Sequence, residues 1–273
     1  MLQPDARSIY TAALTPPPGF VLDQAIATTY SLDPTTLLIL PLHLALLGQQ
    51  RGQDPLTDGI AILEALRRVT RKLTVYAQRG RLQAPRQQHL LYGLLESVVV
   101  EVRAPRGGAF HPKLWLLRFH DTEDKDQVLL RLLVLSRNLT ADRSWDLVLQ
   151  LEGVPGKQYV GINRELGELL AKLPDLAVSD VPEERREQAA SLGDELRRTP
   201  FEAPPGWHLD NLHVLGIKRR AFPRPDYMNQ LAVISPFCHP DALRWLSRGV
   251  AERVLLISRP ETLAELPADV RGL

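Results

Sequence analysis

AFHPKLWLLRFHDTEDKDQVLLRLLVLSRNLTADRSWDLVLQLEG, residues 109–153, contains two runs of large apolar residues separated by a charged segment. The runs at 113–119 (KLWLLRF) and 129–135 (LLRLLVL) hold no glycine or proline, which is typical of buried strands. The charged segment HDTEDKDQ between them is typical of an exposed loop tip, so the two runs predict an antiparallel hairpin. A third run, 145–151 (WDLVLQL), is expected to add the next strand.

Polar residues gather at one end of this hairpin. Side chains alternate between the two faces of a strand, so His111 and Lys113 are expected on the same side. Ser136 and Asn138 leave the end of the second strand with the same spacing. The beginning of the first strand of a hairpin lies beside the end of the second. These four residues are therefore expected to converge at one edge of the sheet.

Such a cluster suits phosphoryl transfer. An imidazole can attack phosphorus and form a covalent phosphohistidine. A lysine ammonium and an asparagine amide can hold the non-bridging phosphate oxygens while negative charge develops on them. Because the nucleophile and the cation both come from the protein, this chemistry needs neither a metal nor a cofactor.

His111-Pro112-Lys113 and Ser136-Arg137-Asn138, with a strand and its return strand between them, resemble the H-x-K and G/S-x-N motifs of the phospholipase D superfamily. The segment SRNLTADRSWD is similar to the tyrosyl-DNA phosphodiesterase branch of that superfamily. The aspartate that many members carry after the lysine would fall at Arg118, and that branch lacks it as this chain does. An H-x-K triplet alone is common by chance, so the resemblance depends on the combination over residues 109–153.

The resemblance implies a nucleophilic role for His111 and phosphate contacts from Lys113 and Asn138, with Ser136 and Asp146 in support. It also implies a second histidine that protonates the leaving oxygen, brought by a second H-x-K half. No other histidine of the chain is followed by x-Lys. The second half is then expected from a missing C-terminal region, a partner chain or a homodimer, or the site is incomplete and inactive.

Apolar runs elsewhere predict strands at 37–40, 73–77 and 98–103, alternating with helices at 57–72 and 89–96. With further helices at 162–173 and 181–198, this order predicts an α/β fold. By resemblance it is a phospholipase D-like mixed β-sheet flanked by helices on both faces, with one complete half plus the beginning of a second.

The predicted elements divide the chain into three domains. Residues 1–198 form the first half, and residues 199–228 form a linker and basic segment with a strand at 209–217. Residues 229–273 start a second, incomplete half. Its strands at 231–236 and 253–258, around a helix at 241–246, match the order of the first half and indicate a weak internal repeat.

Composition narrows the class of protein. The chain has no apolar run of about 18 residues, as a transmembrane helix requires, and no secretory signal at its N-terminus. A single cysteine, Cys238, excludes an internal disulfide and fits a reducing cytosol, so a cytoplasmic location is expected. The net charge of +1 does not by itself indicate nucleic acid.

Several basic residues are candidate contacts to a nucleic-acid backbone. The chain holds 27 arginines against 6 lysines. Arginine suits phosphate contacts, but a GC-rich bacterial genome produces the same bias. Arg106, Lys218, Arg219 and Arg220 are the candidate contacts, and a solvated loop explains the last three equally well.

The leading hypothesis is a metal-independent phosphodiesterase acting through a phosphohistidine. It would be a nuclease or DNA-end-processing enzyme, with a role in bacterial defence or repair. The alternative is a catalytically incomplete nucleic-acid-binding or assembly subunit with a vestigial site. Lipid transphosphatidylation is disfavoured because the sequence holds no membrane-seeking helix.

Overall fold

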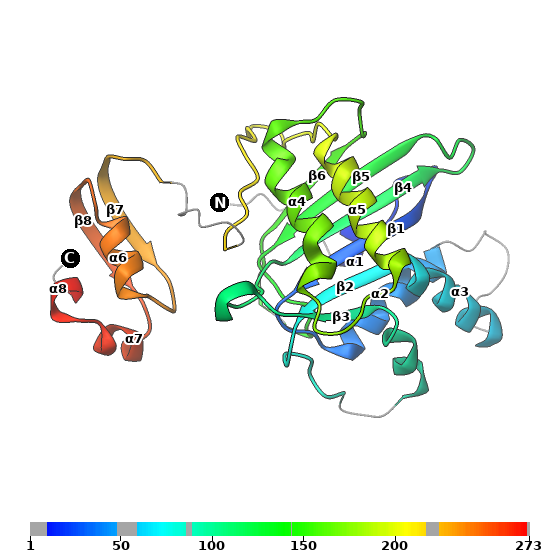
Figure 1. The fold of residues 1–273 in the computed structure, drawn as a ribbon, viewed down its shortest axis with the longest axis horizontal. Helices are drawn as coiled ribbons and strands as arrows, with labels where there is room; N and C mark the ends of the chain where they lie inside the picture. The colour runs from blue at the N-terminus through cyan, green and yellow to red at the C-terminus, as the bar shows by residue number, and fades with distance from the viewer. Residues whose placement is uncertain (1–9, 48–58, 86–88, 143, 217–223, 272–273) are drawn as a thin grey trace. The chain divides into compact units, whose positions relative to one another are not determined.

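The computed structural model describes residues 10–47, 59–85, 89–142, 144–216 and 224–271. The chain divides into two compact units, residues 1–217 and 218–273. Figure 1 shows the six-stranded sheet of the first unit and the two-stranded sheet of the second. Within the described ranges, no helix has the length and apolar character needed to cross a membrane.

The first unit is built on a mixed sheet in the order β3-β2-β1-β4-β5-β6. The three strands β1, β2 and β3 are parallel to one another, and β4, β5 and β6 continue the sheet in antiparallel pairs. The hairpin predicted from the sequence is β4–β5, with Leu114 opposite Val134 and His120 opposite Val128. The strands are β1 (Phe20–Thr29), β2 (Leu73–Gln78), β3 (Val99–Val102), β4 (Leu114–Asp121), β5 (Val128–Leu135) and β6 (Val148–Gly153).

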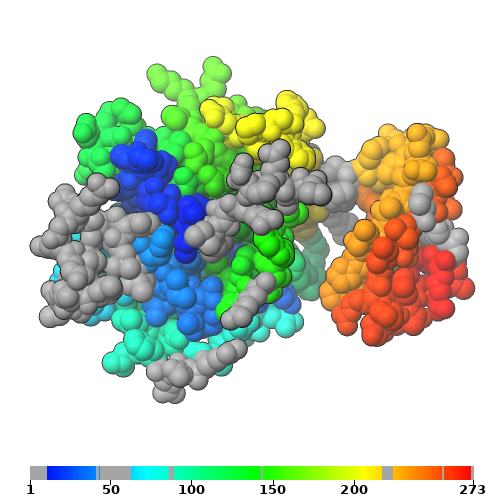
Figure 2. Space-filling model, turned by 180° about the vertical axis from the view of Figure 1, so that it is seen from behind, coloured from blue at the N-terminus to red at the C-terminus, as the bar shows by residue number. Residues whose placement is uncertain are grey.

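Helices cover both faces of this sheet, as predicted. One face packs against α1 (Tyr10–Leu14), α2 (Pro34–Leu47), α3 (Gly59–Lys72) and the 3₁₀ helix η2 (Leu90–Leu95). The blue surfaces of α1 and α2 are visible in the view from behind (Figure 2). The other face packs against α4 (Arg164–Lys172) and α5 (Glu183–Arg197), with the short 3₁₀ helices η4 (Gly161–Asn163) and η5 (Leu173–Leu176).

The side chains of β4 are buried on both faces of the sheet, so the first unit has two hydrophobic cores. Trp115, Leu117 and Phe119 face the first core, whereas Leu114 and Leu116 face the second. All five are buried, which explains why this strand is almost continuously apolar in sequence. The fold is therefore a mixed α/β sheet between two helical layers.

The strand expected at 37–40 is wrong, because this run lies inside α2. The Asp33 carboxylate accepts hydrogen bonds from the backbone N–H groups of Thr35 and Thr36, which is N-cap behaviour, and Pro34 occupies the first helical turn. Leu37 and Leu40 are buried three residues apart while Ile39 is 53 % exposed, which is the helical period. The first strand is instead β1.

Other boundaries also differ from the prediction. Residues 209–216 are an irregular segment rather than a strand, and η2 is a 3₁₀ helix where an α-helix was expected. The strand expected from residue 145 begins only at Val148. Residues 199–216 belong to the first unit rather than to a free linker, since Glu202 pairs with Glu152 beside β6.

The second unit contains a parallel pair, β7 (Met228–Ile234) and β8 (Val250–Ile257), joined through α6 (Pro240–Leu246). Leu243, Leu266 and Val270 form its small core with α7 (Pro260–Glu265) and α8 (Ala268–Arg271). The two strands and the helix predicted here are confirmed with shifted ends. That this unit begins a second phospholipase D-like half stays a prediction.

Candidate active site

The segments that carry the predicted site meet at one edge of the sheet. Because β4 is antiparallel to both β1 and β5, the beginning of β4 lies beside the carboxyl ends of those strands. The backbone N–H of Leu135 donates to the carbonyl of Lys113 at 2.8 Å. The N–H of Leu139 donates to Oγ1 of Thr29, the last residue of β1, at 3.0 Å. These two hydrogen bonds join the end of β5 to the residue before β4, and the loop after β5 to the end of β1.

His111 and Lys113 are in direct contact. The Lys113 Nζ lies 2.9 Å from Nδ1 and 3.2 Å from Nε2 of the imidazole, and it also donates to the His111 carbonyl at 3.1 Å. His111 is exposed and Lys113 is half-buried. The two side chains therefore lie on the same face, as the H-x-K spacing predicts, and the ammonium of Lys113 lies against the imidazole ring of His111.

Tyr30 connects this pair to Asn138. Its ring centroid lies 5.0 Å from that of His111, and its backbone N–H donates to Oδ1 of Asn138 at 3.3 Å. His111, Lys113 and Asn138 are thus gathered around the residue that follows β1. Since Oδ1 accepts the backbone hydrogen bond, the Nδ2 group is the end of the Asn138 side chain that can donate to a bound anion.

The surroundings of His111 favour a neutral imidazole. Partial burial, and then the neighbouring Lys113 ammonium, lower the pKa of His111 below its ordinary value of 6.5. Partial burial also lowers the pKa of Lys113. At neutral pH the imidazole therefore carries an unprotonated nitrogen, which is the form that can attack an electrophile.

Ser136 and Asp146 contact each other. The Ser136 Oγ donates to a carboxylate oxygen of Asp146 at 2.8 Å and accepts from the backbone N–H of Leu147 at 2.9 Å. The Arg137 Nε lies 3.7 Å from the other oxygen of Asp146. These contacts join the segment that carries Asn138 to the chain entering β6. The supporting role of Ser136 and Asp146 in a reaction stays a prediction.

The predicted nucleic-acid contacts are placed only in part. Arg106 lies in the turn η3 (Pro105–Gly107) with a left-handed φ of 57°, and its Nη2 donates to the carbonyl of Gly216 at 2.6 Å. Its described hydrogen bond is therefore within the chain. Lys218, Arg219 and Arg220 lie outside the described residues. A nucleic-acid role for these four residues stays a prediction.

Arg118 has a structural role. Its Nε donates to the Glu195 carboxylate of α5 at 2.9 Å, and its Nη1 forms an ion pair with Asp23 of β1. The position at which many superfamily members carry an aspartate thus holds a cation that joins β4 to β1 and α5. It faces the helical layer, away from the edge that carries His111.

A cavity of about 620 Å³ borders the cluster. His111 and Lys113 form part of its wall, and much of the rest is apolar, including Phe110, Leu166 and Leu169. Residues 211–216 also line it, whereas Asn138 does not. A cavity with few polar groups beside reactive side chains is a typical ligand site. In the described ranges, no group of three or more histidine, cysteine or carboxylate side chains is arranged to hold a metal ion.

Three residues of this region were missed from the sequence. Tyr30 could have been found only by recognising β1, whose end it follows. Arg81, with its guanidinium carbon 5.2 Å from the Tyr30 ring centroid, lies in a loop whose basic character was visible but whose position was not. His213 lines the cavity from a segment nearly 100 residues away in sequence, and no local pattern distinguishes it.

Comparison with known proteins gives structural matches alone. No family model matches the chain, and no curated protein matches it. Its fold is similar to solved structures of yeast tyrosyl-DNA phosphodiesterase, at 14 % identity with a TM-score of 0.39 for the unmodified protein and 0.40 for one of its mutants. The similarity covers 64 % of this chain and 35 % or 34 % of those chains.

The chain spans about a third of the length of these solved chains. At this identity and TM-score the similarity says nothing about chemistry, which depends on the side chains of this chain.

Proposed function

We propose that this chain is a metal-independent phosphodiesterase of phospholipase D type that acts on nucleic acid, as a nuclease or DNA-end-processing enzyme. The observation that supports this most strongly is the gathering of His111, Lys113 and Asn138 around Tyr30. A neutral imidazole, an ammonium and an amide donor at one edge are the parts that attack on a phosphodiester requires.

In the proposed reaction, an unprotonated ring nitrogen of His111 attacks phosphorus. One P–O bond breaks, and the leaving oxygen takes a proton. Water then attacks the phosphohistidine, returns His111 to its neutral form and releases the second product. Lys113 and Asn138 bind the non-bridging oxygens, whose negative charge grows as the new bond forms.

The substrate class follows from the resemblance of SRNLTADRSWD to the tyrosyl-DNA phosphodiesterase branch. The cationic Arg81 beside Tyr30 supports an anionic substrate at the same edge. A role in bacterial defence or repair is part of the proposal. So is a second H-x-K half, supplied by a further region, a partner chain or a second copy.

The alternative is a nucleic-acid-binding or assembly subunit with a vestigial site. The observation that favours it is the absence of a second H-x-K in the sequence. Such a subunit would shift the mobility of labelled DNA without cleaving it. The substitution His111→Ala would leave that binding nearly unchanged.

The test is cleavage of bis-p-nitrophenyl phosphate and of labelled DNA in excess EDTA. The wild-type chain is expected to cleave both, and His111→Ala is expected to lose about 1,000-fold or more in rate, because it removes the nucleophile. Asn138→Asp keeps the oxygen that accepts from Tyr30 but replaces the donor with a negative charge. It is expected to cost about 100-fold.

The control is His208→Gln, because His208 is 89 % exposed and does not line the cavity. It should cleave both substrates at the wild-type rate. DNA binding without turnover by the wild-type chain would favour the vestigial subunit, and full activity in His111→Ala would contradict the proposed chemistry.

A further inference from the structure

We propose that three edge arginines, Arg79, Arg81 and Arg103, bind the phosphates that neighbour the one attacked by His111. The substrate is then an extended strand of nucleic acid rather than a small phosphodiester. The inference rests on the proposed phosphodiesterase function and names the substrate class of the same site. It is carried by the place of the three arginines in the sheet, by their exposure and by the contact between Arg81 and Tyr30.

The edge arginines follow strands that end where the site lies. Because β1, β2 and β3 are parallel, their carboxyl ends lie at the same edge as the beginning of β4. Arg79 follows β2 directly, and Arg103 follows β3 directly. The N–H of Arg79 donates to the Val102 carbonyl at 2.8 Å, which continues the pairing of β2 and β3 to the strand ends. Neighbouring strands lie about 4.8 Å apart, so these two arginines leave the sheet side by side.

Arg81 is joined to the site through the loop after β1. Leu32 forms parallel bridges with Leu82 on one side and with Leu139 on the other. The N–H of Leu32 donates to the Arg81 carbonyl at 3.1 Å. Leu32 and Leu139 both point into the first core, and successive residues of an extended segment point to opposite faces. Arg81 and Asn138, each one residue before a bridge partner of Leu32, therefore share the other face.

The Tyr30 ring lies between the Arg81 guanidinium and the nucleophile. The Cζ atom of Arg81 lies 5.2 Å from the Tyr30 ring centroid, and the His111 ring centroid lies 5.0 Å from it. A cation–π contact restricts the arginine side chain without neutralising its charge. Arg81 is exposed, so its N–H donors stay open to a ligand. A phosphate next to the one attacked by His111 is therefore within its reach.

In the described part of the chain, no carboxylate pairs with the edge arginines. All three are exposed. The acids of the neighbouring loops are engaged elsewhere, since Glu101 accepts from the N–H of Gly80 at 3.0 Å, and Asp33 accepts from the N–H groups of Thr35 and Thr36. The fork of N–H donors on an arginine matches the oxygens of a phosphate. This edge therefore offers three unneutralised charges to an anionic polymer.

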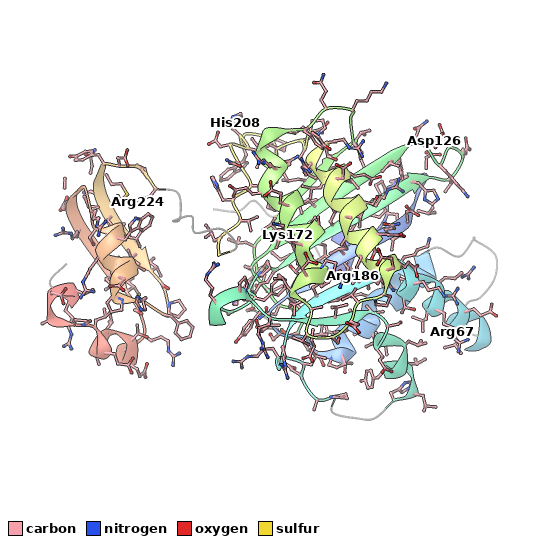
Figure 3. The ribbon with its side chains drawn as sticks, viewed as in Figure 1. Arg67, Asp126, Lys172, Arg186, His208 and Arg224 are labelled. Carbon is pink, nitrogen blue, oxygen red and sulfur yellow. The ribbon has the colours of Figure 1, made fainter. Side chains whose placement is uncertain are left out.

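The tip of the β4–β5 hairpin, at the opposite edge of the sheet, has the opposite charge. Its residues 121–127 (DTEDKDQ) hold four carboxylates and one lysine, and Figure 3 labels Asp126 among them. Repulsion at this tip and attraction at the edge arginines favour one placement of an anionic strand. It runs from His111 across the ends of β1, β2 and β3.

The salt dependence of binding tests the contacts. The probe is a labelled ten-nucleotide oligothymidylate, and every chain carries His111→Ala so that the strand is not cut. Each phosphate contact to a single strand contributes about 0.7 to the slope of log affinity against log salt concentration. The triple variant Arg79→Gln, Arg81→Gln, Arg103→Gln should therefore lose about 2 from that slope, and about 100-fold in affinity at about 0.1 M salt.

The matched control is Arg67→Gln, Arg68→Gln, Arg71→Gln, which removes the same charge from exposed arginines of α3. This helix ends at the start of β2, towards the edge away from the site, and Figure 3 labels Arg67 on it. The control should keep the unmodified slope. An unchanged slope in the edge variant, or equal losses in both triple variants, would overturn the inference, because net charge alone would then account for binding.

Cleavage by chains that retain His111 separates this inference from the proposed function. On the ten-nucleotide strand the edge variant should lose about 100-fold in kcat/KM, mostly through KM, since the neighbouring phosphates bind equally before and during the reaction. On the dinucleotide of two thymidines, which has one phosphate, it should lose less than about 5-fold, because charges beyond direct contact are screened. Retained dinucleotide cleavage also shows that the variant is folded.

Equal losses on the strand and the dinucleotide would contradict the role of the edge arginines. If the wild-type chain cleaves neither substrate, the proposed function itself fails. The salt slopes are measured without turnover, so they test the arginine contacts in either case.

Discussion

At the scale of single residues, the Lys113 ammonium lies against the His111 imidazole, with Nζ 2.9 Å from Nδ1. Burial and the ammonium both lower the pKa of the imidazole, with burial the larger cause. Above that pKa the His111 imidazole is mainly neutral. The rate of the proposed reaction should therefore increase as the pH rises through a midpoint below 6.5. Protonation below the midpoint removes the nucleophile.

Lys113→Met removes the charge while keeping a side chain of similar length. One cause of the lowered pKa is then lost, so the pKa of His111 should rise towards 6.5 but stay below it, since burial remains. The measurement is an NMR titration of the imidazole in the wild-type chain and the variant. An unchanged or lower midpoint in the variant would show that the ammonium does not act on the ring.

The sequence predicted part of this arrangement. His111 and Lys113 lie on one face and Asn138 lies near them because the period of a strand and the geometry of a hairpin are local properties. The residues that complete the site depend on tertiary structure. Tyr30 comes from the end of a strand that is two strands away from β5 in the sheet, and His213 comes from an irregular segment.

At the scale of elements, two glycines bring α4 and α5 close together. A Cβ built on Gly193 would lie 2.7 Å from the Gly167 carbonyl and 3.1 Å from the Ala171 backbone nitrogen. A Cβ on Gly167 would lie 2.6 Å from the Gly193 carbonyl. The helices therefore pack backbone against backbone over the second core.

Gly193→Ala is expected to destabilise the first unit by about 1–2 kcal/mol. Overpacking costs about 1–3 kcal/mol, and the better helix propensity of alanine offsets part of it. The measurement is the free energy of unfolding in urea. Gly93→Ala in η2 is the matched control, because its Cβ would meet no atom within 4 Å. Equal stability of the two variants would contradict the close packing.

The elements that the sequence predicted well are those with long, unambiguous apolar runs, such as β4 and β5. Residues 37–40 (LLIL) were misassigned because a short apolar run fits a strand or a buried helix equally well. The Asp33-Pro34 start signal was the feature that could have decided it. The sequence did not predict β1, because Asp23 and Gln24 interrupt its apolar pattern. The Asp23 carboxylate forms an ion pair with Arg118 of β4.

At the scale of the whole molecule, every described residue assigned a chemical role lies in the first unit. The second unit is a β–α–β arrangement whose sheet exposes Ile234, Leu255 and Ile257. Parallel strands are usually covered on both faces, whereas these three side chains are exposed in the described structure.

The most direct test of the central claim is to trap the covalent intermediate. The full chain is mixed with an excess of bis-p-nitrophenyl phosphate in EDTA, quenched in alkaline denaturant within milliseconds and analysed by peptide mass spectrometry. The proposed reaction predicts a phosphoryl adduct on the peptide containing His111, which decays as product forms and is absent from His111→Ala. Turnover without that adduct, or an adduct on another residue, would contradict it.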